Sequence, residues 1–88
     1  MKYSINIGHI LQYLDVDKRK ENGFCVVLGF RGVDSTNFEI TALNLSTEDP
    51  EGRLISITIS KFPARKDLVL RSLNDDSWSA WCTLRTHR

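Results

Sequence analysis

The chain has 88 residues, of which 41% are apolar and 26% are charged, and its net charge is +1. This length and composition are typical of one folded domain and argue against a disordered chain, so we expect residues 1–88 to form a single domain. No apolar run approaches the roughly 18 residues that cross a bilayer, and the N-terminus lacks the apolar core of a signal peptide. We therefore expect a cytoplasmic protein that does not enter membranes.

The first element expected from the sequence is a helix over residues 5–14, with Ser4 or Asn6 as its cap. Four apolar residues recur at the i, i+3, i+4, i+7 spacing of one helix face: Ile7, Ile10, Leu11 and Leu14. A short strand is the competing interpretation, because apolar residues also alternate before Gly8. The polar segment that follows ends in Asn22-Gly23, which is a turn signal.

Apolar alternation predicts four strands in the rest of the chain. They span residues 24–30, 38–45, 53–60 and 78–85. The third is the clearest, because its isoleucines alternate with serine and threonine, and β-branched residues favour extended backbone. In the second, the apolar alternation changes face after Ala42, and a bulge near Ala42 would reconcile its two halves.

Residues 64–73 are compatible with either a helix or a strand. Pro63 suits a helix start, and Asp67 and Arg71 have a supportive i, i+4 spacing. However, the segment also alternates, and a strand here would make residues 74–77 a hairpin turn. The expected fold is α+β, with an N-terminal helix followed by an antiparallel meander of four or five strands. A small closed barrel becomes possible if residues 64–73 form a strand.

Recognisable reaction chemistry is missing from the sequence. The chain contains no nucleophile elbow, phosphate-binding loop or zinc-protease motif, and its histidines are His9 and His87. The two cysteines, Cys25 and Cys82, form neither a metal-ligand cluster nor a disulfide framework. We therefore expect no enzymatic activity, no metal site and no cofactor.

The preferred functional hypothesis is a protein-binding accessory or regulatory module, of the inhibitor or adaptor type. An open edge strand would recruit a partner by main-chain pairing, and a surface tryptophan would anchor it. On a strand Trp78 and Trp81 point to opposite faces, so one of them is expected to be at least partly exposed. The residues predicted to contact the partner are Trp81, Arg71 and Arg85.

The alternative hypothesis is a nucleic-acid-binding sheet or barrel. Residues 1–52 contain five Lys/Arg and eight Asp/Glu, a net charge of −3, whereas residues 53–88 contain seven and three, a net charge of +4. Four basic residues of the C-terminal part are predicted to contact phosphates: Arg53, Lys61, Arg65 and Lys66. Self-association into a homo-oligomer is compatible with both hypotheses.

Overall fold

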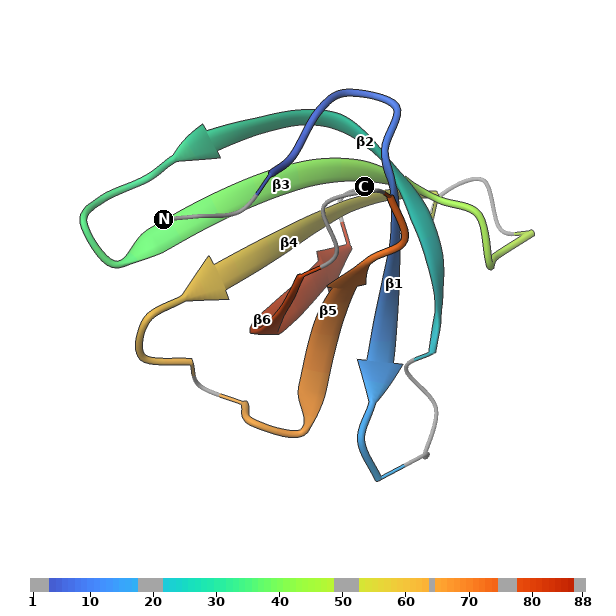
Figure 1. The fold of residues 1–88 in the computed structure, drawn as a ribbon. Helices are drawn as coiled ribbons and strands as arrows, with labels where there is room; N and C mark the ends of the chain where they lie inside the picture. Colours follow the sequence, from blue (N-terminus) through green and yellow to red (C-terminus); the bar gives the residue numbers. More distant parts are fainter. Residues whose placement is uncertain (1–3, 18–21, 49–52, 64, 75–77, 87–88) are drawn as a thin grey trace.

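The computed structural model describes residues 4–17, 22–48, 53–63, 65–74 and 78–86. Six antiparallel strands form a closed barrel in the order β1-β2-β3-β4-β6-β5, and β5 pairs again with β1 (Figure 1). The strands are β1 (Ile10–Asp15), β2 (Gly23–Gly32), β3 (Asn37–Asn44), β4 (Leu54–Ser60), β5 (Leu68–Ser72) and β6 (Ser79–Thr86). Chain order is followed from β1 to β4, and the last two strands are exchanged.

The core lies inside the barrel and consists of side chains from alternate positions of the strands. Ile55, Ile57 and Ile59 of β4 are buried, which confirms the strand predicted over residues 53–60. The other strands contribute further buried residues, mainly apolar, to the same core. They include Leu11, Cys25, Val27, Ile40, Ala42, Leu68, Leu70 and Cys82. Closure of the sheet lets every strand pair on both sides, so the outer face of the barrel is where a partner can bind.

The N-terminal helix expected over residues 5–14 is absent, and the α+β class is therefore wrong. Residues Ile10–Asp15 form β1, in which every second residue is buried. Ile7, which the expected helix would have buried, is 70% exposed, and Gly8 has a φ of 92° that interrupts a helix at this point. The described residues contain no helix, and hence none long and apolar enough to cross a membrane.

Strand β5 settles the conformation of the segment that was compatible with helix or strand. Of residues 64–73, residue 64 lies outside the described residues, and Leu68–Ser72 form β5. Leu68, Leu70 and Ser72 are buried, which is the period of two expected for a strand. The barrel linked to the strand alternative is therefore the observed fold.

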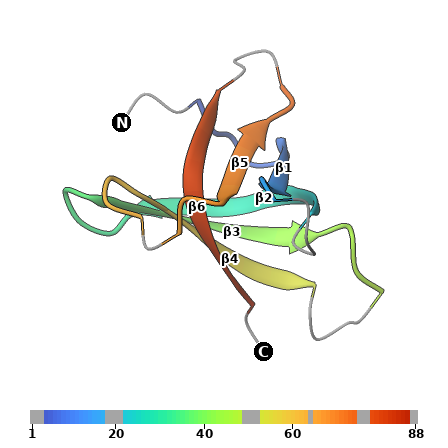
Figure 2. The same cartoon turned by 90° about the horizontal axis from the view of Figure 1, so that it is seen from below.

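A β-bulge lies in β2, and not in β3 where it was expected. The register of the β2–β3 pair shifts after Val27, opposite Ala42. A bulge in β3 that would turn Leu43 and Leu45 to the same face as Ala42 is therefore absent, because β3 keeps a single alternation and Leu45, just beyond it, is 53% exposed. Leu28 at the bulge is also exposed. Figure 2 shows β2, β3 and β4 side by side. The exposed residues Leu28 and Leu45 therefore belong to one long curved face of the barrel.

Candidate functional site

Trp81 lies on the outer surface of the barrel. Its two neighbours in β6 pack in or against the core, so the alternation of the strand turns the indole outward, where 40% of Trp81 is exposed. Antiparallel pairing places it opposite Val69 of β5. Trp78, by contrast, packs against the core and donates its Nε1–H to the carbonyl oxygen of Ser4 at 3.1 Å. Trp81 is therefore the tryptophan that a ligand can reach.

The loop between β4 and β5 brings a second aromatic side chain to the same surface. Phe62 is 75% exposed, the highest value among the large apolar residues described. Its backbone N–H donates to Ser60 Oγ at 3.1 Å, which bends the chain as it leaves β4. The N–H of Lys61 donates to the carbonyl oxygen of Thr36 at 2.8 Å and so ties the loop to the β2–β3 hairpin. These bonds position Phe62 although its ring is not packed in the core.

Trp81 and the loop enclose a surface hollow with a volume of about 350 Å³. The hollow is lined by Lys61, Phe62, Pro63, Lys66 and Trp81. We call these five residues the aromatic hollow. Its volume falls within the range of small-ligand sites, which is roughly 300–1,000 Å³.

The indole of Trp81 also borders a second, smaller hollow of about 220 Å³, which is lined by Val69, Ser79, Ala80 and Trp81. Open space therefore adjoins the indole toward the β4–β5 loop and toward β5.

The aromatic hollow carries uncompensated positive charge. Within the described ranges, neither Lys61 nor Lys66 forms an ion pair. The ammonium nitrogen of Lys61 lies 6.0 Å from the centroid of the Phe62 ring, at the limit of a cation–π contact. Because no described carboxylate is paired with either ammonium group, an anion that enters the hollow can bind both lysines without displacing an acidic side chain.

The structure combines residues from the two predicted sites. Trp81, predicted to contact a protein, lies with Lys61 and Lys66, predicted to contact nucleic acid. Arg71 is exposed on β5 in the diagonal position relative to Trp81, about 7–8 Å away between Cα atoms. Arg85 lies four residues farther along β6, about 13 Å from Trp81 along the strand.

The other two predicted arginines are not part of the aromatic hollow. Arg65 pairs with Asp67 through two contacts, Nε to Oδ1 at 3.1 Å and an NH2 group to Oδ2 at 3.2 Å. Arg53 precedes β4, at the opposite end of that strand from Lys61. Its carbonyl oxygen accepts a hydrogen bond from the N–H of Asn44, which connects it to β3.

Sequence reasoning did not identify Phe62 and Pro63 as part of a site. The available signal was the tripeptide Lys61-Phe62-Pro63, an aromatic residue between a cation and a proline directly after a strand. A strand ending there leaves the aromatic ring without a sheet face to cover it. That pattern indicates an exposed ring, although it does not show what the ring faces.

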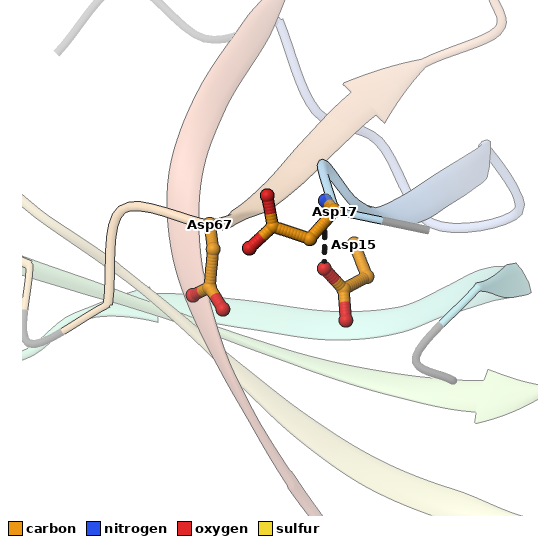
Figure 3. A group of neighbouring side chains, drawn as sticks. All are labelled: Asp15, Asp17 and Asp67. Carbon is orange, nitrogen blue, oxygen red and sulfur yellow. Dashed lines mark hydrogen bonds between the residues drawn. The ribbon is translucent and has the colours of Figure 1, made fainter. Parts of the chain in front are cut away.

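Three carboxylates also meet at one end of the barrel. Oxygen atoms of Asp15, Asp17 and Asp67 lie within 4.8 Å of one another (Figure 3). The N–H of Asp17 donates to Oδ1 of Asp15 at 3.0 Å. Asp67 is already neutralised by the two contacts from the Arg65 guanidinium. An arginine therefore compensates part of the charge that a metal ion would otherwise compensate.

The described histidine and cysteine side chains show no pairing of a nucleophile with a base. Among the described residues no hydrogen-bond partner reaches the buried Nδ1 of His9, so the group that would orient a general base is missing there. Cys25 and Cys82 are both buried, and neither forms a disulfide within the described part of the chain. Burial raises the pKa of the Cys25 thiol to about 12, so this group carries its proton at neutral pH.

Comparison with protein-family models, with curated proteins and with solved structures found no match to this chain. The geometry and charge of the barrel surface are therefore the features that indicate a function.

Proposed function

We propose that this barrel binds single-stranded nucleic acid at the aromatic hollow, without catalysing a reaction. One observation carries the proposal: the exposed side chains of Trp81 and Phe62 lie in a single hollow with Lys61 and Lys66, which form no ion pair with any residue that the structure describes. Bases stack on aromatic side chains with little regard to sequence, and lysines neutralise the phosphates between them. A single strand supplies both groups at short, regular intervals.

Because the barrel is closed, we now prefer the nucleic-acid-binding hypothesis to the protein-binding one. A protein-binding module was preferred because an open strand edge would recruit a partner, but each of the six strands pairs on both sides. Main-chain pairing with a partner strand would require one of these ladders to open. The exposed tryptophan was the other reason to prefer a protein partner. It has two lysines beside it, however, and therefore suits an anionic ligand with flat apolar groups.

Single strands fit the outer surface better than duplexes do. In a duplex the bases are stacked on one another and present their faces to no side chain, so Trp81 and Phe62 would contribute little. In a single strand the bases are free to stack on them, at about 1–3 kcal/mol per base. We therefore expect a clear preference for single strands over a duplex of equal length.

Fluorescence anisotropy with labelled oligothymidylate, oligouridylate and a mixed-sequence duplex tests this proposal at low salt. Trp81→Ala should weaken single-strand binding about 5- to 150-fold, which corresponds to the loss of one stacked base. Trp81→Phe, the matched control, keeps an aromatic face and should retain most of the affinity. If neither DNA nor RNA single strands bind, or if Trp81→Ala binds as tightly as the wild type, the proposal is wrong.

A further inference from the structure

A second surface feature lies away from the aromatic hollow, on the outer face of β2, β3 and β4. Antiparallel pairing places Val26 beside Leu43, and Leu43 beside Leu54. Residues paired in this way project to the same side of the sheet, and the buried apolar residues of all three strands point inward. The row Val26-Leu43-Leu54 is therefore an apolar line across the outside of three strands.

A second apolar row adjoins the first. The N–H of Leu45 donates to the carbonyl oxygen of Phe24 at 2.8 Å, so these two residues continue the β2–β3 pairing. Leu28 extends the apolar surface at the bulge. We call the six residues the outer apolar face: Phe24, Val26, Leu28, Leu43, Leu45 and Leu54.

The outer apolar face is large for a chain of this size. Phe24, Leu28 and Leu54 are each 42–45% exposed and Leu45 is 53% exposed, while the remaining two residues are half-buried. Taken together, the six side chains expose on the order of 400 Å² of apolar surface, which is the size of the largest patch on a typical monomer, a patch that is often functional. A standard dimer interface buries roughly 800 Å² per partner, with an apolar centre and a polar rim. The face has the area of such a centre.

The charges on and around the outer apolar face indicate which kind of molecule packs against this face. None of its six residues is charged, so two copies placed face to face bring no like charges together at the centre. The described charged residues within three positions of it in sequence are Arg31, Glu48 and Arg53, which are exposed and include both signs. A two-fold axis repeats both signs at the rim of the interface, which allows attraction between copies there.

We propose that the outer apolar face is the interface of a homodimer, in which a second copy of the chain packs its own β2–β3–β4 surface against the first. The interface is isologous, because one surface serves both copies. It leaves the aromatic hollow free, since Trp81 lies on β6 and Lys61 and Lys66 lie beyond the far end of β4 from Leu54. This inference does not rest on the proposed function, and the dimer can exist whether or not nucleic acid binds.

Sedimentation velocity of the full chain over a range of concentrations tests the dimer. The wild type should sediment at twice the mass of one chain and dissociate only on dilution. Phe24→Lys and Leu45→Lys, each on the outer surface, should raise the dimer dissociation constant at least 100-fold, because each buries an unpaired charge in both copies. Val33→Lys is the matched control, since Val33 is 50% exposed in the β2–β3 turn and lies outside the face.

Circular dichroism of the variants establishes that each one is folded before its mass is interpreted. A folded Phe24→Lys or Leu45→Lys that is monomeric where Val33→Lys and the wild type are dimeric supports the interface. A wild-type chain that remains monomeric at the highest soluble concentration overturns it, as does a dimer that both lysine variants leave intact. Chemical cross-linking of the wild type at low concentration provides a second reading that does not depend on any substitution.

Discussion

Consider the double variant Lys61→Ala/Lys66→Ala, which removes both cations of the aromatic hollow without touching its rings. Both lysines line the same hollow, and neither forms an ion pair within the described part of the chain. Each phosphate that a protein neutralises on a single strand contributes about 0.7 to the slope of log affinity against log salt concentration. The double variant should therefore lose about 1.4 from that slope.

The expected slope has a direct consequence for affinity. A tenfold rise in salt should weaken the wild type about 25-fold more than the double variant, because the variant no longer releases those counterions. The two affinities should thus differ most at low salt and converge as salt rises. Loss of an aromatic ring would instead lower affinity by a similar factor at every salt concentration.

Anisotropy titrations of a labelled oligothymidylate at several salt concentrations measure the slope. Arg31→Ala/Arg53→Ala is the control for net charge, because it removes two exposed positive charges that lie outside the hollow, Arg31 on β2 beside Glu39 and Arg53 before β4. Its slope should remain close to that of the wild type. Equal slopes for the wild type and the lysine variant would refute the proposed phosphate contacts, and an equal loss in the control would assign the effect to net charge alone.

Three further predictions concern the barrel itself. Ile57→Ala should lower the free energy of unfolding by about 2–5 kcal/mol, measured by urea denaturation, because Ile57 is fully buried. Gly23→Ala should cost about 1–3 kcal/mol in the same assay, since the added Cβ would lie 2.6 Å from Ser46 Oγ. The Cys25 thiol, with a pKa raised from 9.0 to about 12, should resist alkylation in the folded protein at pH 9 and react after unfolding. The unfolded chain releases this proton first, so stability should fall as pH rises from about 9 to 12.

The strands with a clean alternation could be predicted from sequence. Ile55, Ile57 and Ile59 alternate with small polar residues, and their inward orientation follows from the period of two. The barrel could be stated only as an alternative, because closure depends on pairing between β1 and β5, which lie far apart in the chain. No local pattern encodes that contact.

The first strand was mistaken for a helix because its inward positions are not purely apolar. Tyr13 and Asp15 are buried, and both use polar atoms there. The Tyr13 hydroxyl donates to Asn44 Oδ1 at 3.0 Å, and Asp15 Oδ1 accepts from the N–H of Asp17. A carboxylate at an inward position hides the period of two. The apolar residues on both faces of β1 then happen to match a helical spacing.

The candidate site could be predicted only in parts. The outward position of Trp81 follows from the alternation of its strand. The net positive charge of residues 53–88 follows from a count of their charged residues. The meeting of Trp81 with Lys61 and Lys66 depends on the exchange of the last two strands, which places β6 between β4 and β5. Consecutive pairing of β4 with β5 would have separated the loop from Trp81.

The strand order also explains how a chain with a net charge of +1 can attract a polyanion. Strands β4, β6 and β5 come from the part of the sequence with a net charge of +4 and are contiguous in the barrel, and the aromatic hollow lies among them. The barrel measures 33 × 28 × 26 Å, whereas charges are screened over about 8 Å at physiological salt. A phosphate at the aromatic hollow therefore responds to Lys61 and Lys66, and carboxylates on the far side of the barrel contribute little to its binding.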